Sequence, residues 1–415
     1  MLKRVLMIAY HFPPLAGSSG IQRTLRFVQH LPSFGWQSVV LSAHPRAYER
    51  TSKDLESEVP EGTIVRRAFA LDTARHLAIG ARYFAAMARP DRWVSWKFDA
   101  VRQGMQMIRD MAPCVIWSTY PIATAHLIGA ELHRRSGIPW IADFRDPMAQ
   151  DGYPEDPLTH RGFLRIEEVV ARNAAWCTFT TPSAARMYRE RYPFAADRIV
   201  GIENGYDEES FAFAERLNAG GIAPLNPGFT TLLHSGIVYP SERDPGPLFE
   251  ALGRLRERGL LEAAKVRIRF RAAVHDELLR TLAARHAVER WVEICAPLGY
   301  QAALQEMLRA EALLLMQGAN CKEQIPAKAY EYLRARRPIL CLSAAGGDTA
   351  AMLHQAGISS VASLESADQI EAAIPSFLQS VRDGSAQTPA DDVMQMASRT
   401  RRSEALAKLL NVVVS

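Results

Sequence analysis

The chain has 415 residues, of which 48% are hydrophobic and 23% are charged, a composition typical of a globular rather than a disordered protein. Its 49 Lys and Arg against 45 Asp and Glu leave a formal net charge of +4, which argues against a nucleic-acid partner. The length suits two or three domains, and no wholly apolar run reaches the about 18 residues that cross a bilayer.

The N-terminus and the cysteines both indicate a protein of the reducing cytoplasm. An apolar stretch follows Lys3 and Arg4 as in a secretory signal, but it ends at His11 and no small-residue cleavage site follows. The five cysteines lie at least 20 residues apart, so they form neither a CxxC metal pair nor a disulfide framework. We expect a cytoplasmic protein, with peripheral contact to the inner membrane face as a further option.

Short apolar runs alternate with longer amphipathic stretches, which predicts parallel sheets with helices on both faces. In the first half the expected strands are residues 5–9, 38–41, 63–65, 114–117, 140–142, 177–180 and 199–202. In the second half they are residues 230–234, 266–270, 292–295, 312–316 and 339–342. We predict the α/β class, with one doubly wound parallel-sheet domain over residues 1–208 and another, including the terminal helix, over residues 229–415. Residues 209–228 form the predicted linker, because residues 219–228 are rich in Gly and Pro and lack periodicity.

A loop rich in glycine and serine follows the first expected strand. It consists of Gly17, Ser18, Ser19 and Gly20, and an amphipathic helix starts near Thr24. Glycine lets the backbone approach a bound anion closely, and the free N–H groups of a helix start point toward that anion, so a diphosphate suits the loop. Neither a GxGxxG fingerprint nor a P-loop sequence is present, so a turn without a ligand is the alternative.

Polar residues also follow two later strands of the first domain. Asp143, Arg145 and Asp146 come after the strand at residues 140–142, and His126 lies on the helix that follows the preceding strand. Open α/β sheets bind ligands beyond the carboxyl ends of their strands, so these residues are candidates for a binding site. The alternatives are a structural ion-pair cluster and, for His126, an ordinary hydrogen-bonded histidine.

Residues 66–109 form the most basic stretch of the first domain, and aromatic residues are interleaved with its charges. Its basic residues are Arg66, Arg67, Arg75, Arg82, Arg89, Arg92, Lys97, Arg102 and Arg109, against three aspartates. Such a segment can lie on an anionic membrane or meet a lipid pyrophosphate. It can also be a solvated helix face whose aromatic residues belong to the core.

In the second domain, a loop follows the strand at residues 230–234 and contains Gly236 and Arg243. An arginine near a helix start can bind a phosphate through two hydrogen bonds, because it adds its charge to the positive end of the helix. Read alone, Arg243 also fits a plain surface residue.

Two glutamates follow the strand at residues 312–316. Glu323 precedes a helix whose first turn contains Pro326, and Glu331 lies on that helix, eight residues further on. This spacing lets the two carboxylates contact different parts of one elongated ligand, and a carboxylate can hold the hydroxyl pair of a ribose. A solvated glutamate is the alternative for Glu331.

The order and spacing of these motifs resemble the retaining, nucleotide-sugar-dependent glycosyltransferases of the family-4 type, which have a GT-B fold. The resemblance covers nearly the whole chain, from the loop at residues 12–23 to the terminal helix. The other segments that carry it are residues 143–147 (DFRDP), 203–207 (ENGYD), 243–245 (RDP) and 323–331 (EQIPAKAYE). It implies two Rossmann-like domains that face a cleft, with the acceptor in the N-terminal domain and the donor in the C-terminal domain.

The resemblance also implies roles for the candidate residues. Glu331 would hold the ribose, Glu323 would hold the hydroxyls of the donor sugar, and Arg243 and Lys328 would neutralise the diphosphate. The donor-binding residues it implies are Gly17, Ser18, Ser19, Gly20, Gly236, Gln324, Ile325 and Glu331, with the first four closing over the diphosphate and the amides of Gln324 and Ile325 facing sugar and phosphate. The acceptor-side residues are Asp143, Arg145 and Asp146.

The chain departs from the family pattern at two places. Ile237 stands where many relatives have a basic residue, which leaves Arg243 with fewer helpers. Thr119 and Tyr120 stand where several relatives have a histidine after the fourth strand, so His126, further into the helix, is the candidate for a base-like catalytic group.

No Asp-x-Asp sequence occurs, so we expect sugar transfer without a metal or another cofactor. The expected donor is a UDP- or GDP-sugar, and the expected acceptor is a glycan or a lipid-linked molecule of bacterial polysaccharide or glycolipid synthesis. Two other functions stay open. One is a non-catalytic nucleotide-sugar-binding scaffold, which Ile237 favours, and the other is a nucleotide-sugar epimerase, which would need an acid/base pair that the sequence does not show.

Overall fold

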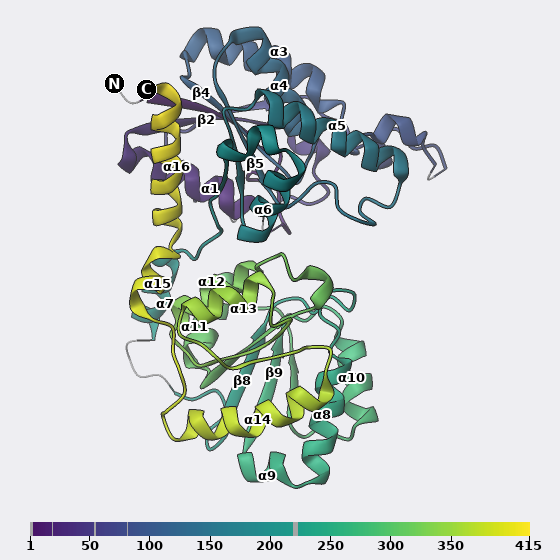
Figure 1. Ribbon diagram of the computed structural model, residues 1–415, viewed down its shortest axis with the longest axis vertical. Helices are drawn as coiled ribbons and strands as arrows, with labels where there is room; N and C mark the ends of the chain where they lie inside the picture. Colours follow the sequence, from purple (N-terminus) through teal and green to yellow (C-terminus); the bar gives the residue numbers. More distant parts are fainter. Residues whose placement is uncertain (1–2, 19, 54, 81, 219–222) are drawn as a thin grey trace. The chain divides into compact units, whose positions relative to one another are not determined.

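The computed structural model describes residues 3–18, 20–53, 55–80, 82–218 and 223–415. The chain divides into two compact units, Met1–Asn204 with Arg399–Ser415 and Gly205–Ser398 (Figure 1). Each unit is built on one parallel sheet with helices packed on it. The predicted class, α/β with two doubly wound parallel sheets, is therefore confirmed.

The sheet of the first unit has seven parallel strands in the order β3-β2-β1-β4-β5-β6-β7. The strands are β1 (Lys3–Ile8), β2 (Trp36–Ala43), β3 (Ile64–Ala68), β4 (Val115–Thr119), β5 (Trp140–Arg145), β6 (Trp176–Phe179) and β7 (Ile199–Gly201). Each of the seven strands expected in the first half overlaps one of them. Because the chain changes direction of travel across the sheet between β1 and β4, the carboxyl ends of these two strands form its topological switch point.

Apolar side chains alternate between the two faces of this sheet and build a core on each. In β1, Leu6 and Ile8 belong to one buried cluster, whereas Val5 and Met7 belong to another. A strand that is buried on both faces needs a continuous apolar run. For this reason the short apolar runs of the sequence predicted these strands well.

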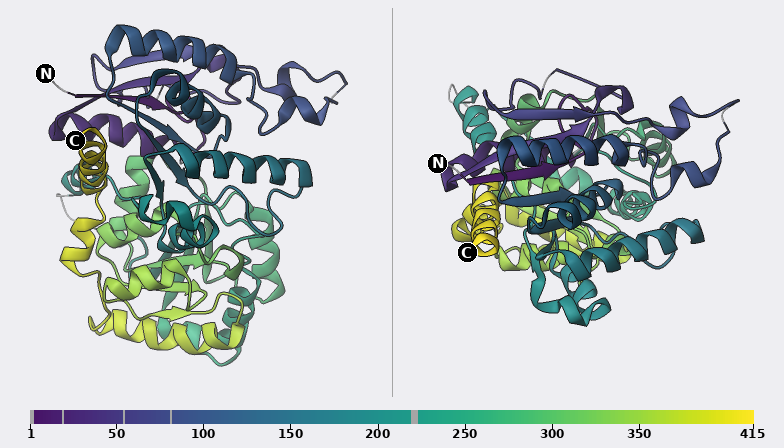
Figure 2. Two further views of the ribbon diagram at one scale, coloured as in Figure 1. Left: turned by 45° about the horizontal axis from the view of Figure 1, so that its top comes forward. Right: turned by 90° about the horizontal axis from the view of Figure 1, so that it is seen from above.

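The helices of the first unit are α1 (Gly20–His30), α2 (Thr73–His76), α3 (Trp96–Met111), α4 (Thr124–Ser136), α5 (Pro157–Asn173), α6 (Pro182–Arg191) and α16 (Arg399–Val414). Its short 3-10 helices are η1 (Leu31–Phe34), η2 (Pro45–Ala47), η3 (Ala85–Ala88) and η4 (Pro193–Arg198). Figure 2 shows the segment between β3 and α3, which contains α2 and η3, extending away from the body of this unit.

The terminal helix α16 packs beside α1 of the first unit (Figure 1). Leu406 and Leu410 on α16 are buried in the same cluster as Val5 of β1. Asn411 accepts a hydrogen bond from the indole N–H of Trp36 at 3.2 Å. The structure therefore corrects the prediction that the terminal helix belongs to the second domain, because its apolar face is covered by the first.

The second unit contains six parallel strands in the order β10-β9-β8-β11-β12-β13. The strands are β8 (Thr230–Ser235), β9 (Val266–Arg271), β10 (Val292–Cys295), β11 (Ala312–Gln317), β12 (Ile339–Ser343) and β13 (Val361–Ala362). The first five overlap the expected strands. The sequence analysis missed β13, whose two residues are too short for a recognisable apolar run. The switch point of this sheet lies between β8 and β11.

The helices of the second unit are α7 (Glu208–Leu217), α8 (Gly246–Glu257), α9 (Leu260–Ala264), α10 (Asp276–Arg285), α11 (Tyr300–Arg309), α12 (Ala327–Ala335), α13 (Asp348–Gln355), α14 (Ala367–Arg382) and α15 (Asp391–Met396), with the 3-10 helix η5 (Ala319–Cys321). The predicted linker at residues 209–228 needs correction, since most of its first half is α7. Phe211 of α7 is buried, and α7 packs on α11. Residues 219–222 lie outside the described part of the chain. No helix among the described residues is long and apolar enough to cross a membrane.

Candidate functional site

The loop that follows β8 lies at the switch point of the second sheet, where open α/β sheets bind ligands. Gly236 has a φ of +110°, a backbone conformation that side chains rarely permit. A Cβ atom at this position would lie 3.0 Å from the Lys328 ammonium nitrogen on α12. Glycine is therefore needed here both for the turn and for the close approach of this lysine.

Two basic side chains meet directly at the end of β8. His234 is fully buried, and its Nδ1 lies 3.0 Å from the carbonyl oxygen of Leu314 on the neighbouring strand β11. Its Nε2 lies 3.0 Å from Nζ of Lys328. Burial lowers the pKa of both groups well below their usual values. The charge of Lys328 lowers the His234 pKa further, and Arg243 lowers the Lys328 pKa, which Glu331 raises.

Arg243 is a second cation at this place and is also buried. Its Nε donates to the carbonyl of Met316 at 3.1 Å, and its Nη1 donates to the carbonyl of Ile237 at 3.3 Å. Its guanidinium lies 5.3 Å from the centre of the Tyr239 ring. Within the described part of the chain, neither Arg243 nor Lys328 forms an ion pair with a carboxylate. Two cations held mainly by neutral groups make this loop suitable for an anion.

The two glutamates lie on either side of the start of α12, as predicted. Glu323 lies in the loop before the helix, and Glu331 lies on the helix, where its Oε1 accepts a hydrogen bond from the Tyr300 hydroxyl at 3.0 Å. Buried Ile325 lies between them. The amide of Gln324 donates to the Cys321 carbonyl at 3.0 Å. This contact corrects the expectation that the Gln324 amide faces a ligand, because the turn already uses it.

In the first unit, a compact polar cluster surrounds the start of α1. The Ser18 hydroxyl accepts a hydrogen bond from the Gly20 amide at 3.2 Å and lies 3.1 Å from Nδ1 of His11. A Cβ atom on Gly20 would lie 2.4 Å from that nitrogen and 2.8 Å from Nη1 of Arg145. Burial, with a contribution from Arg145, lowers the pKa of His11 to about 3. The cluster therefore holds a neutral histidine beside an arginine.

A cavity of about 280 Å³ adjoins this cluster. Its lining residues are Tyr10, His11, Leu15, Ala16, Gly17, Ser18, Glu49, Arg50 and Trp93. The ring centres of Tyr10 and Trp93 are 4.9 Å apart, so one wall of the cavity is aromatic. Of the predicted loop, Gly17 and Ser18 reach this cavity. Ser19 lies outside the described residues.

Asp143 belongs to a structural ion pair rather than to an open site. It is fully buried, and Arg23 of α1 donates to both of its oxygens, from Nε at 2.9 Å and from Nη2 at 2.7 Å. The hydroxyls of Thr119 and Thr178 each donate to it at 2.7 Å. The expected acceptor-side role of Asp143 is therefore corrected, because its oxygens are used within the core.

The neighbouring residues Arg145 and Asp146 lie closer to the surface than Asp143. Nη1 of Arg145 is 3.4 Å from the Gly20 carbonyl and 3.5 Å from the Tyr120 carbonyl, and its buried Nε has no hydrogen-bond partner among the described residues. Burial raises the pKa of Asp146, although Arg145 opposes this effect. Arg145 and Asp146 thus remain at the carboxyl end of β5, near the start of α1.

His126 is buried in the core of the first unit, where no substrate can reach it. Its Nδ1 lies 2.8 Å from the Ser118 hydroxyl, which also accepts a hydrogen bond from Trp140 at 2.8 Å. Its ring packs against Phe144 with centres 4.9 Å apart. Burial lowers its pKa to about 4. The predicted catalytic role of His126 is therefore corrected in favour of the structural alternative.

The sequence analysis missed His234, Arg23 and Tyr300, which contact the candidate residues directly. A signal existed for His234, because it is an ionisable residue that follows Leu232 and Leu233 at the carboxyl end of its strand. No comparable signal identifies Arg23, since its partner Asp143 is 120 residues away. None of the described His, Cys, Asp and Glu side chains form a group of three that could hold a metal ion.

Comparisons with known proteins identify a family for part of the chain and the fold of the whole. A family model described as a glycosyl transferase 4-like domain matches residues 19–205. The structure resembles a glycosyltransferase from Rickettsia africae (TM-score 0.69, 9% identity, 100% of this chain and 99% of the other). It also resembles sucrose-phosphate synthase from Thermosynechococcus elongatus (0.66, 12%, 99% of both) and Anabaena HepE in complex with UDP (0.61, 12%, 100% and 97%). A comparison with curated protein sequences found no significant match. Residues 19–205 thus match the glycosyl transferase 4-like domain, and the chain as a whole has the GT-B fold of these solved structures.

Proposed function

We propose that this glycosyltransferase moves a sugar from a UDP- or GDP-sugar to an acceptor hydroxyl with retention of the anomeric configuration, in bacterial polysaccharide or glycolipid synthesis. The observation that carries the proposal is the pair Arg243 and Lys328, two cations that form no ion pair with a carboxylate of the described chain. Solved structures of Anabaena HepE with UDP, with UDP-glucose and with UDP and glucose support a nucleotide-sugar donor.

The diphosphate of the donor binds at Arg243 and Lys328, next to the Gly236 turn. In the reaction, the bond between the anomeric carbon and the diphosphate oxygen breaks, and a bond to the acceptor oxygen forms. The electron pair of the broken bond leaves with the diphosphate. Fixed cations stabilise the charge that develops there, which is the main electrostatic contribution to such a transfer.

The two glutamates hold the ends of the donor. Glu331 accepts hydrogen bonds from the ribose hydroxyls, and Tyr300 orients it through the hydrogen bond to its Oε1. Glu323 accepts hydrogen bonds from the sugar hydroxyls. Buried Ile325 anchors the loop between them, and the two carboxylates can contact different parts of one nucleotide sugar.

The acceptor binds in the first unit, at the cavity of about 280 Å³ with one wall formed by Tyr10 and Trp93. The CH groups of a sugar ring pack well on an aromatic surface, and the polar groups of His11, Ser18 and Glu49 can bind its hydroxyls. Glycans and lipid-linked sugars both present such a ring. This cavity replaces Asp143 as the acceptor-side site.

We also propose that the transfer needs no metal ion. The sequence lacks Asp-x-Asp, and Arg243 and Lys328 can supply the positive charge that a metal would supply to the diphosphate. Transfer should persist at full rate in excess EDTA. Loss of transfer in EDTA, with recovery on addition of Mn²⁺ or Mg²⁺, would contradict this part of the proposal.

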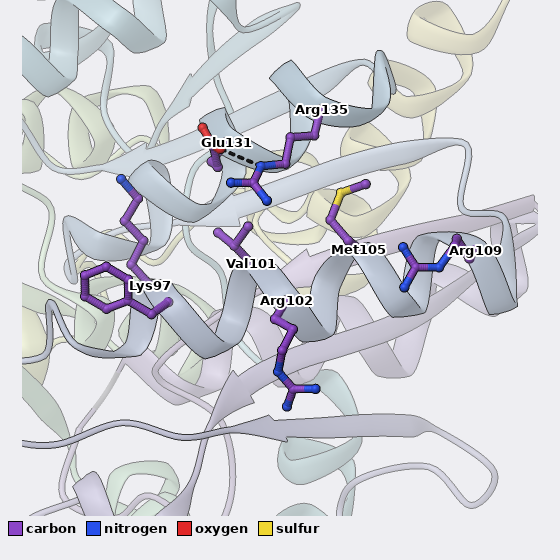
Figure 3. Close-up of a pocket in the computed structure, with 8 residues that line it drawn as sticks. Lys97, Val101, Arg102, Met105, Arg109, Glu131 and Arg135 are labelled. Carbon is purple, nitrogen blue, oxygen red and sulfur yellow. Dashed lines mark hydrogen bonds and ion pairs between the residues drawn. The ribbon is translucent and has the colours of Figure 1, made fainter.

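The protruding segment between β3 and α3 supports a peripheral contact with an anionic membrane (Figure 2). Ile79 and Phe84 there are 88% and 81% exposed, and Phe98 at the start of α3 is 79% exposed. Adjacent α3 and α4 form a groove of about 580 Å³ lined by Lys97, Arg102, Arg109 and Arg135, with Glu131 between them (Figure 3). Exposed apolar side chains beside a basic groove suit a surface of anionic lipid.

The predicted basic and aromatic residues of this region divide into two groups in the structure. Trp96 is buried in the core, and Arg92 pairs with Asp72 and Glu49. Phe84 and Phe98 face solvent and are therefore the better substitutions for a test. Phe84→Ser with Phe98→Ser should abolish sedimentation with phosphatidylglycerol vesicles. Absence of sedimentation in the parent protein would leave this segment a solvated surface.

A panel of UDP-, GDP-, ADP- and dTDP-sugars, screened by thermal shift and followed by an assay of transfer and slow donor hydrolysis, tests the main proposal. We expect one UDP- or GDP-sugar to raise the unfolding temperature and to be turned over. Tight binding without any turnover would instead favour the non-catalytic scaffold. Absence of binding by every nucleotide sugar would overturn the proposal.

A further inference from the structure

His234 is a buried polar residue. Neither the sequence motifs nor the proposed chemistry explains its presence. It is fully buried at the carboxyl end of β8, and its ring lies 5.9 Å from the Phe270 ring of the adjacent strand β9. A buried imidazole without a hydrogen-bond network is costly, so both of its ring nitrogens need partners. Leu314 and Lys328 are those partners, and the Ile237 backbone also interacts with the ring.

The partners determine which ring nitrogen carries the proton. The Leu314 carbonyl oxygen can only accept, so Nδ1 of His234 carries the hydrogen and donates it across 3.0 Å. The other nitrogen, Nε2, then presents a lone pair to the Lys328 ammonium at 3.0 Å. The ring must be neutral, because a protonated imidazole would place two donors face to face. Burial and the charges of Lys328 and Arg243 favour this neutral form.

This geometry fixes the ammonium group on two sides. One of its three hydrogens points to Nε2 of His234. Gly236 lies on another side of the ammonium, where a Cβ atom would be 3.0 Å from Nζ. Lysine is a long and mobile side chain, and immobilising it costs conformational entropy unless the fold does so beforehand. The remaining hydrogens have no hydrogen-bond acceptor within the described ranges, so they can bind an anion.

We propose that His234 is a positioning residue, which uses the lone pair of Nε2 to hold the Lys328 ammonium in place for the donor diphosphate. Because Lys328 is buried and faces Arg243, diphosphate binding at this ammonium takes up a proton. This inference rests on the proposed function, since it assumes that Lys328 binds the diphosphate. His234 itself touches no substrate.

The proton uptake follows from the charges that face Lys328. Arg243 faces it from the loop after β8, Glu331 lies one turn further on α12, and neutral His234 faces it from the sheet. Burial and Arg243 lower the pKa of Lys328 in the free protein. A bound diphosphate adds negative charge and raises that pKa again. Because the bound state holds more protons, the affinity for a nucleoside diphosphate should increase as the pH falls through this range.

Two substitutions separate the two hydrogen bonds of His234. The amide of Asn in His234→Asn can replace Nδ1 as the donor to Leu314 but does not reach Lys328. The longer side chain of Gln in His234→Gln can place its carbonyl oxygen near the position of Nε2. For UDP or GDP, whichever the wild type binds, we expect His234→Asn to weaken binding by about tenfold, and His234→Gln by less than about threefold. Equal weakening in both variants, or no weakening in either, would overturn the positioning role.

A buried histidine can also matter only for stability, so His126→Gln in the core of the first unit is the matched control. It should lower the unfolding temperature and leave nucleoside-diphosphate affinity unchanged. A general effect of removing any buried histidine would instead weaken binding in this control as well. That outcome would remove the support for a specific role of His234.

Calorimetry of the wild type in two buffers of different ionisation enthalpy measures proton uptake without any substitution at His234. We expect uptake that grows with pH over the range in which free Lys328 loses its proton. The variant Lys328→Arg, which stays charged at all accessible pH values, should bind with no uptake. Binding by the wild type without proton uptake would overturn this inference but leave the proposed function intact. Absence of any nucleoside-diphosphate binding would overturn the proposed function itself.

Discussion

The two units share one sheet topology, but buried charges near the carboxyl ends of their strands have opposite surroundings. In the first unit, the guanidinium of Arg23 on α1 is neutralised by buried Asp143 of β5, with further acceptors at the carbonyls of Ile202 and Glu203. In the second unit, Lys328 and Arg243 lie at the carboxyl ends of β8 and β11, and their partners are a neutral histidine and backbone carbonyls.

This difference separates a charge used for folding from a charge used for binding. A buried ion pair with its hydrogen bonds completed stabilises the fold and leaves nothing for a ligand. Buried cations without a carboxylate repel each other and lower the stability of the free protein, and a bound anion reverses this effect. Cations near the carboxyl ends of parallel strands can therefore serve either purpose, and the difference lies in a few side chains.

The largest expected effect is on the stability of the first unit. Arg23→Met leaves the Asp143 carboxylate buried without its cation, which should lower the free energy of unfolding by about 3–5 kcal/mol in urea denaturation. The double variant Arg23→Met/Asp143→Leu removes both charges and should recover most of the loss. If Arg23→Met were as stable as the parent protein, the Arg23–Asp143 ion pair would not be structural.

Next in size is the effect of the uncompensated cations on binding. Lys328→Met and Arg243→Met should each weaken binding of the nucleoside diphosphate by roughly 10- to 100-fold in calorimetry, because hydrogen bonds to charged groups contribute about 1.5–3 kcal/mol. Neither should lower the unfolding temperature by as much as Arg23→Met. Arg290→Met, at an exposed surface pair of the same unit, is the matched control and should change neither property. Unaltered nucleoside-diphosphate affinity in both Lys328→Met and Arg243→Met would contradict the proposed difference between the two units.

The two glutamates should differ in what they change. Glu331→Ala should weaken nucleoside-diphosphate binding about tenfold, because it removes the acceptor for the ribose hydroxyls. Glu323→Ala should mainly lower the rate of sugar transfer, because its partner is the sugar. Calorimetry and a transfer assay on the same preparations distinguish the two effects. Equal loss of nucleoside-diphosphate affinity in both variants would contradict these roles.

The smallest effect concerns acid stability. The pKa of His126 is lowered from 6.5 to about 4 in the folded protein, so below pH 6.5 the unfolded chain binds a proton that the folded core still excludes. Stability from this group is therefore fully present above pH 6.5 and decreases as the pH falls to about 4. Thermal unfolding at several pH values should show a shallower decrease for His126→Gln. Parallel curves for the two proteins would contradict the burial of a neutral His126.

The sequence predicted the parallel sheets well because strands buried on both faces need apolar runs, and β1, β8 and β11 have them. Gly236, Arg243 and the two glutamates were predicted as site residues because they follow such strands, and Lys328 was predicted from the family resemblance. The terminal helix α16 could not be assigned, since its partner α1 lies at the opposite end of the chain.

The failures at Asp143 and His126 have a common physical cause. Residue type and position after a strand do not show whether a polar side chain points into the core or toward a ligand. Arg23 and Ser118 decide the matter through hydrogen bonds, and no local pattern connects them to their partners. His234 was missed for the reverse reason, since it lies within a strand but contacts a residue of the site.

The most direct test of the central claim, that the uncompensated cations of the second unit hold the donor diphosphate, is a crystal structure of the protein with UDP or GDP bound. The account predicts phosphate oxygens within about 3 Å of Nζ of Lys328 and of the Arg243 guanidinium. His234 should keep its contact with Lys328, and the Arg23–Asp143 pair should be unchanged. A diphosphate bound away from both Lys328 and Arg243 would contradict the account.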